Sequence, residues 1–472
     1  MSRHSNSSIF ASYTLVAILS AIISFATMIV LTRTTSEAFF GQINKFLTAS
    51  NLVMSLACLG LDSAYIRFYY DPPKNTNSKQ LAWKCITPAL IIFLLISFVI
   101  LFFRNNTSLL PPLGGGGLFF SIAFILTTLS QFLNRFLTIY FRMNSNVLSF
   151  SIVTIAFVIL TKTIFIPVHA VTPKFEDNIT TAAIFLTIFM SGYFLFYIRN
   201  IIEIPHHTAA NYRPVYRFAL LSSPVFVITY LNSYLPQVII SKNLGDNVLG
   251  IYSAALLFSS AILVLSRGFS TFWSPYMFKN YKTERDTIRK THDIVLLTSV
   301  VVLSTILIFN DLFYLSIGEA FRQNQNILGM LLIYPIVIII VETVAYGISI
   351  EKKNEISLII YLISMVTNVV LCFALTPKYG LGGVAFASMI SAIEQMTLMT
   401  YFGQKYYKSI NHIGRTLFHM FVLVVSAIIF YFLYDNRIAF IIVETIMLAI
   451  CFIYDRNVIL WCFKFLKSKI NQ

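Results

Sequence analysis

The sequence predicts an all-α protein that crosses a membrane about fourteen times. Hydrophobic residues make up 57% of its 472 residues and charged residues only 11%, whereas soluble domains carry about 25% charged residues. Apolar runs recur along the whole chain, and a span takes about 20 such residues. They lack the polar–apolar alternation of barrel strands, so they predict helices. The predicted spans lie near residues 10–32, 43–66, 82–103, 117–140, 147–168, 180–201, 216–240, 248–272, 294–316, 327–350, 356–376, 381–403, 415–434 and 438–455.

Two of these spans carry local signals of their own. The first follows a polar segment, Met1–Ser8; it is too long for a signal peptide and has no small-residue cleavage site after it, so we expect it to be retained. The seventh contains Pro224 and Pro236, and a proline inside a helix removes a backbone donor. We expect these prolines to bend the helix and to act as a hinge, with a static kink as the alternative.

The distribution of lysine and arginine predicts that both chain ends are cytoplasmic. If the N-terminus is inside, 25 of the 34 basic residues fall in inner gaps and nine in outer gaps, which agrees with the positive-inside rule. We assign the net charge of +15 to this bias and to contact with anionic membrane lipids. A nucleic-acid partner is not expected, because the sequence shows no soluble basic domain.

An internal repeat predicts two similar halves. Residues 29–43 align without a gap on residues 238–252, at an offset of 209, so that Glu37 matches Asp246 and Gly41 matches Gly250. The two segments close the first and the seventh span; chance similarity of two apolar helix ends is the alternative. The repeat predicts two six-helix lobes related by a pseudo-two-fold axis along the membrane normal, a plan that many transporters use. The predicted parts are residues 1–202, residues 203–403 and, with two extra helices and a basic cytoplasmic tail, residues 404–472.

Three short motifs carry a family resemblance. They are GLDSAYIRFY at residues 60–69, NLG through GIYSA at residues 243–254, and PKYGLGGVA at residues 377–385. With fourteen spans, this set resembles the polysaccharide flippases of the multidrug/oligosaccharidyl-lipid/polysaccharide exporter superfamily, which include O-antigen and other lipid-linked oligosaccharide flippases. The chain departs from that family at residues 234–237, Tyr-Leu-Pro-Gln, where an acidic residue is common.

The resemblance implies a function and a location. It implies a two-lobed transporter in the bacterial cytoplasmic membrane that alternates between inward-open and outward-open states. The implied substrate is undecaprenyl-pyrophosphate-linked oligosaccharide for surface polysaccharide assembly, and polysaccharide polymerase or other assembly proteins are the implied protein partners.

Basic residues inside the spans are the candidate substrate ligands. A charge in the bilayer costs about 2.5–3.5 kcal/mol on insertion scales and usually faces a cavity or a partner. Arginine offers a bidentate fork to a pyrophosphate. We expect Arg67 and Arg267, near the inner ends of the second and eighth spans, to bind the anionic headgroup, with Arg135 as a third candidate. The alternative is that these side chains extend to the inner interface.

Acidic residues inside the spans are the candidates for coupling to an ion. Asp62 lies five residues before Arg67, and Glu342 and Glu394 lie in the middle of the tenth and twelfth spans. A carboxylate there is expected to be protonated or paired, which suits proton or sodium coupling; a structural ion pair or contact is the alternative. We expect no cofactor and no metal, because the seven histidines and five cysteines show no ligand spacing.

Four classes of function compete for this sequence. The first is the lipid-linked oligosaccharide flippase, which a cationic cavity would favour. The second is an ion-coupled small-molecule or drug antiporter of the same superfamily, which an acidic cavity would favour. The third, a membrane polysaccharide polymerase or glycosyltransferase, is disfavoured, because the gaps between spans reach only about 20 residues and hold no catalytic constellation. The fourth is a scaffold for polysaccharide-assembly proteins.

Overall fold

The computed structural model describes residues 3–103, 117–162, 175–204 and 211–461, and over these residues the fold is all-α. The chain divides into two compact units, unit 1 (residues 1–250) and unit 2 (residues 251–472). Unit 1 contains α1 (Arg3–Thr34), α2 (Glu37–Cys58), α3 (Leu61–Phe68), α4 (Ser78–Phe102), α5 (Gly117–Met143), α6 (Val147–Lys162), α8 (Phe175–Ile201) and α9 (Arg213–Leu244). The helix α10 (Asp246–Asn280) begins in unit 1 and continues into unit 2, which contains α11 (Arg285–Ile308), α12 (Asn310–Ser316), the short 3₁₀ segments Glu319–Arg322 and Gln325–Ile327, α13 (Leu328–Val344), α14 (Tyr346–Ile350), α15 (Asn354–Tyr406), α16 (Ile413–Phe432) and α17 (Arg437–Tyr454).

Each predicted span falls on helices of the described residues, the fifth (147–168) only as far as Lys162, where this described stretch ends. The all-α polytopic fold is thereby confirmed. Nine of the described helices are long and apolar enough to cross a bilayer, or ten if α2 and α3 form one broken span. Helix α15 counts once in that number although it holds two predicted spans. Its backbone is non-helical at Gly380, and the Ser388 hydroxyl donates to Asn368 Oδ1 at 3.5 Å across this break, so the chain reverses direction there.

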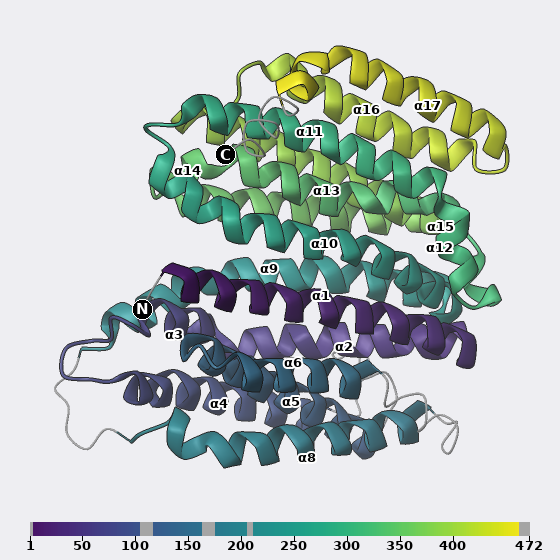
Figure 1. The fold of residues 1–472 in the computed structure, drawn as a ribbon. Coiled ribbons are helices and arrows are strands. Elements are labelled where there is room, and N and C mark those ends of the chain that lie inside the picture. The colour runs from purple at the N-terminus through teal and green to yellow at the C-terminus, as the bar shows by residue number, and fades with distance from the viewer. Residues whose placement is uncertain (1–2, 104–116, 163–174, 205–210, 462–472) are drawn as a thin grey trace. The chain divides into compact units, whose positions relative to one another are not determined.

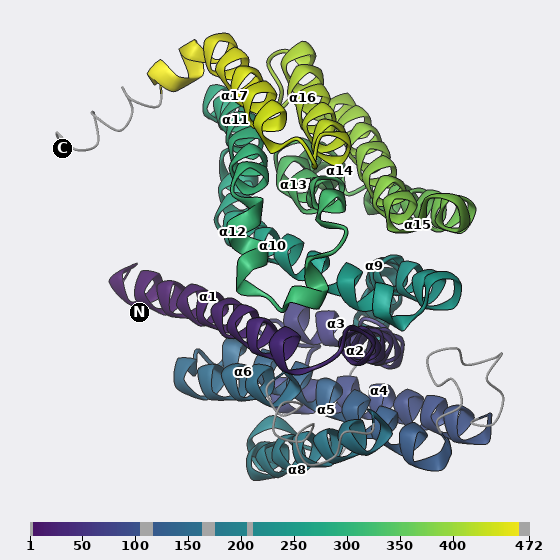
Figure 2. The ribbon, with the colours of Figure 1, turned by 90° about the vertical axis from the view of Figure 1, so that its right-hand side faces the viewer.

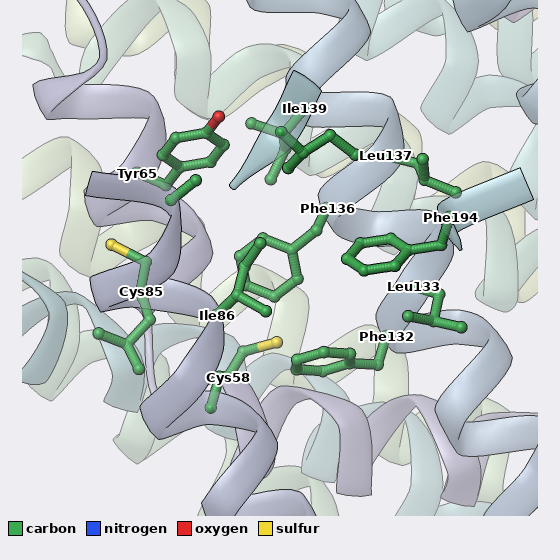
Figure 3. Packing of buried hydrophobic residues seen from close by; sticks show 14 of the residues in the cluster. Cys58, Tyr65, Cys85, Ile86, Phe132, Leu133, Phe136, Leu137, Ile139 and Phe194 are labelled. Atoms are coloured by element: carbon green, nitrogen blue, oxygen red, sulfur yellow. The ribbon is translucent and has the colours of Figure 1, made fainter. Parts of the chain in front are cut away.

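Helix α5 is the centre of unit 1. It packs against α2, α4, α6 and α8, and Figure 1 shows these helices running side by side. Side chains from α2, α3, α4, α5 and α8 fill the interior, among them Cys58, Tyr65, Phe136 and Phe194 (Figure 3). Lipid tails are as apolar as these side chains, so the cluster stabilises the unit by close packing rather than by exclusion of water. It fixes α3 against α5, the two helices that carry Asp62 and Arg135.

A close backbone contact joins the two segments of the sequence repeat. A Cβ atom on Gly41 would lie 2.6 Å from the carbonyl oxygen of Asp246, and one on Gly250 would lie 2.0 Å from the carbonyl oxygen of Glu37. In the repeat alignment, Gly41 corresponds to Gly250 and Glu37 corresponds to Asp246. The contact of Gly41 with Asp246 is therefore the counterpart of the contact of Gly250 with Glu37. A two-fold axis between two similar helix ends produces such a reciprocal contact. The contact between the two repeat segments is therefore reciprocal, and the axis that relates the two predicted lobes stays a prediction.

Helix α13 holds the central position in unit 2. It packs against α11, α15 and α16, as Figure 2 shows, and α17 packs against α11 and α16. Helix α11 begins at Arg285, nine residues before the predicted start of the ninth span at residue 294. Ile288 and His292 in its early turns are fully buried within the unit.

The two helices that the repeat leaves over, α16 and α17, belong to unit 2 together with the helices before them. Along the chain, unit 1 ends at residue 250. The domain boundaries predicted from the repeat are residues 202 and 403. The division into residues 1–202, 203–403 and 404–472 stays a prediction.

Candidate functional site

A break between α2 and α3 positions Asp62 inside unit 1. The two helices meet at an angle of 58°, and Leu59 and Gly60 at the break have φ values of 42° and 74°. A Cβ atom on Gly60 would lie 2.3 Å from the Ala219 carbonyl oxygen, so glycine lets the break pack directly on α9. Asp62 thus falls in the first turn of α3, where the helix dipole favours a negative charge.

The partner of Asp62 is Arg135 on α5. Both Nη2 and Nε of Arg135 contact Asp62 Oδ2, at 2.7 Å and 2.8 Å. The Asp62 side chain is 9% exposed and the Arg135 side chain 37% exposed. The acid is therefore enclosed, whereas part of the Arg135 side chain reaches the surface of the unit.

This geometry presents one edge of a guanidinium for further binding. Asp62 occupies the Nε–Nη2 edge, which leaves the Nη1 edge for another acceptor. Arg135 lies eight residues before the end of α5, which places it about 12 Å into the helix. Tyr230 on α9 and Cys58 on α2 lie close enough to interact with its charge. The arrangement suits capture of an anion within the inner half of the predicted span.

The other two candidate arginines are placed differently. Arg67 is exposed at the end of α3, with its guanidinium carbon 5.5 Å from the centre of the Phe68 ring. The ion pair of Asp62 is with Arg135 on α5, which is the structural pair that the sequence analysis gave as the alternative for this acid. Arg267 lies on α10 in unit 2, and its side chain is outside the described part of the structure.

The candidate acids of unit 2 are both partly buried. The Glu342 carboxylate on α13 accepts a hydrogen bond of 3.2 Å from the Tyr346 hydroxyl, and its backbone oxygen accepts one of 3.0 Å from Trp273 Nε1. Glu394 lies on the second half of α15, and its Oε2 atom is buried without a hydrogen-bond partner among the described residues. An ion-coupling role for Glu342 and Glu394 stays a prediction.

The two prolines of the proposed hinge lie within one continuous helix. Pro224 and Pro236 are both inside α9, whose helical assignment runs unbroken from Arg213 to Leu244. A hinge role for these prolines stays a prediction.

The sequence analysis missed a polar network near the Gly41–Gly250 contact. Asp246 Oδ1 accepts from Lys45 Nζ at 3.1 Å and from the Ser241 hydroxyl at 2.5 Å, and Asp246 Oδ2 accepts from Gln42 Nε2 at 2.8 Å. The repeat had singled out Asp246, but its partners Lys45 and Gln42 lie about 200 residues away in sequence. The sequence alone would have predicted this network only if the two repeat segments had been assumed to pack against each other at Gly41 and Gly250.

The helical spans and the intramembrane ion pair define the class: this is a multi-pass membrane protein with a charged site inside its helix bundle. The model of the family described as "Polysaccharide biosynthesis protein" matches residues 9–281. This is more than half of the chain, and the protein belongs to that family. The resemblance carried by the three motifs is thereby confirmed. No curated protein matches the sequence significantly.

Several solved structures share the fold. The lipid II flippase MurJ, in an inward closed conformation, superposes with a TM-score of 0.64 at 17% identity, over 95% of this chain and 99% of that chain. An inward-facing multidrug resistance transporter of the MATE family gives 0.55 at 13% identity, over 83% and 97%. The MATE transporter VcmN from Vibrio cholerae gives 0.52 at 13% identity, over 84% and 98%. At such identities the likeness concerns the fold.

Proposed function

We propose that this protein is a flippase that moves undecaprenyl-pyrophosphate-linked oligosaccharide from the inner to the outer leaflet of the bacterial cytoplasmic membrane. The observation that carries the proposal is the half-buried Arg135, whose Nε and Nη2 atoms Asp62 holds in place, so that Nη1 is not used by this ion pair. A pyrophosphate is a matching acceptor for the Nη1 edge, because paired hydrogen bonds from arginine to phosphate are strong and oriented. Membership of a polysaccharide biosynthesis family supports a sugar-bearing substrate.

The fold supports the same proposal from a second side. The structural neighbours include a protein described as a lipid II flippase, so this helix arrangement can move a lipid-linked molecule. In the proposed cycle, the headgroup binds Arg135 from the inner side. Glu394 is the best candidate for binding a coupling ion, because its buried Oε2 atom has no hydrogen-bond partner among the residues that the structure describes.

The proposal is tested by removing the ion pair without leaving a lone charge. The double variant Asp62→Asn/Arg135→Gln is expected to reach the membrane at the wild-type level and to translocate substrate roughly 10–150-fold more slowly. This loss corresponds to about 1.5–3 kcal/mol, the usual worth of a hydrogen bond to a charged group. The measurement is surface polysaccharide, together with inner-leaflet lipid-linked oligosaccharide, in a flippase-deficient strain.

The matched control removes another ion pair that lies away from Arg135 in the chain. Arg437 Nε lies 3.2 Å from Asp311 Oδ2, and Asp311→Asn/Arg437→Gln is expected to retain export. Wild-type export by the Asp62→Asn/Arg135→Gln variant would reject the proposal.

The orientation proposed here has a separate test. Both termini are expected in the cytoplasm, since basic residues concentrate in the gaps on that side. Reporter fusions at Met1 and Gln472 that are active only in the cytoplasm should therefore both be active. One active and one inactive fusion would contradict the proposed topology.

A further inference from the structure

Three ion pairs meet in unit 2 at the predicted inner ends of α11, α16 and α17. Arg415, in the first turn of α16, lies between two carboxylates: its Nη1 is 2.5 Å from Asp293 Oδ2 and its Nε is 3.2 Å from Asp455 Oδ1. One turn further along α16, His419 Nε2 lies 2.6 Å from Asp455 Oδ2. The side chains of His419 and Asp455 are completely buried.

Asp455 depends on His419 for a hydrogen bond. Asp455 Oδ1 and Arg415 Nε are 3.2 Å apart, but they are not aligned as a hydrogen bond. Neither atom has a hydrogen-bond partner among the described residues. The 2.6 Å contact with His419 is therefore the hydrogen bond of this buried carboxylate.

The other ring nitrogen of His419 determines how many protons the pair holds. Nδ1 lies 2.9 Å from the backbone oxygen of Arg415, and a carbonyl oxygen only accepts, so Nδ1 carries a hydrogen. A neutral imidazole has one N–H, which would leave Nε2 bare and facing a carboxylate oxygen. Two acceptors do not approach to 2.6 Å. A second proton must lie between Nε2 and Asp455, whether it is bonded to the ring or to the carboxyl group.

The charge balance of the cluster requires the same proton. Arg415 contributes one positive charge, and Asp293 and Asp455 contribute one negative charge each. With the shared proton the cluster is neutral, and without it a net negative charge is buried, which is costly. Of the neighbouring groups, α17 contributes Tyr454, whose ring lies under Arg415, and the thiol of Cys451.

The neighbouring His292 on α11 provides an internal comparison. The Thr343 hydroxyl donates to the Ile340 oxygen, so it must accept from His292 Nδ1, at 2.7 Å. His292 Nε2 then accepts from the Thr416 hydroxyl at 2.9 Å. One proton on the ring satisfies His292, whereas His419 and Asp455 need an additional one. Of these two buried histidines, only His419 faces a carboxylate.

We propose that His419 and Asp455 form a binding site for one proton, which ties the end of α17 to α11 and α16. Asp455 directly follows the last residue of α17, Arg415 lies in the first turn of α16, and Asp293 lies eight residues after the start of α11. Loss of the proton would leave two acceptors in contact and would push these helix ends apart. The inference is independent of the transported substrate.

The test counts protons released when the purified full-length protein is unfolded at about pH 8.5. In the unfolded chain at that pH, a histidine is neutral and an aspartate is ionised, so the shared proton is released. In the Asp455→Asn variant the amide can donate to a bare Nε2, and Arg415 balances Asp293, so no extra proton is needed. We expect the wild-type protein to release one proton more than Asp455→Asn, as read from a pH-indicator dye.

His292→Gln is the matched control and is expected to release as many protons as the wild-type protein. Equal release by the wild-type protein and Asp455→Asn would overturn the proposal. If Asp455→Asn does not fold, ¹⁵N-histidine spectra of the wild-type protein at the same pH decide the question. A ring with a proton on both nitrogens, or with Nε2 bonded to a protonated carboxyl, supports the site. The Nε2 of His292 accepts from the Thr416 hydroxyl, and its signal is identified by its loss in His292→Gln. Spectra in which every histidine is neutral and no other Nε2 takes part in a hydrogen bond would overturn the site.

Discussion

Replacing Arg135 by glutamine while Asp62 is kept is expected to destabilise unit 1 by about 3 kcal/mol, because the substitution leaves a buried carboxylate without its counter-charge. The value lies at the lower end of the range for broken buried pairs, since Arg135 is itself 37% exposed. The measurement is the free energy of unfolding of the purified protein in detergent.

The double variant separates the structural role of this pair from its proposed role in transport. Asp62→Asn/Arg135→Gln removes both charges, so most of the lost stability should return, although the export defect should persist. A double variant that is as unstable as Arg135→Gln alone would show that the pair matters for more than charge balance. A stable Arg135→Gln protein would show that Asp62 is not held as a buried anion.

Gly250→Ala is expected to have the second large effect, because it forces apart the two segments of the repeat. The new Cβ atom would lie 2.0 Å from the Glu37 carbonyl oxygen, which is backbone and cannot rotate away. We expect a loss of about 1–3 kcal/mol from overpacking. Gly41→Ala should lose less, since its Cβ atom would lie 2.6 Å from the nearest atom. The melting temperature should therefore fall more for Gly250→Ala than for Gly41→Ala.

Gly192→Ala is the matched control for this series. Gly192 lies inside α8, and a Cβ atom there would have no neighbour within 4 Å. Alanine favours a helix over glycine by about 1 kcal/mol, so this variant should be as stable as the wild-type protein or more stable. If the melting temperature of Gly250→Ala equalled that of Gly192→Ala, this would contradict the close contact between the repeat segments.

The sequence predicted the candidate site unevenly. It identified Asp62 and Arg135 as charges inside spans, because an ionisable residue stands out against an apolar run. It did not identify the partner of Asp62, because local spacing shows only Arg67, five residues away; Arg135, the partner in the structure, lies 73 residues further along the chain. The GLDSAYIRFY motif pointed to the right place, and the positive φ of Leu59 and Gly60 is the physical reason that a helix breaks there.

The histidine–aspartate cluster shows the limit of spacing arguments most clearly. His419 follows Arg415 by one helical turn, a signal that is visible in the sequence, but Asp293 and Asp455 lie on two other helices. Without the packing of α11, α16 and α17, nothing marks these four residues as one group.

The sequence by itself determined that this protein is a bundle of membrane-spanning helices and where nearly every helix lies, because a bilayer demands long apolar runs and satisfied backbones. It also determined the family, through short motifs at helix breaks. Only the tertiary structure decided which charges meet. Ion pairs inside the bundle depend on which helix faces come together, and in an apolar chain hydrophobicity does not distinguish one face from another.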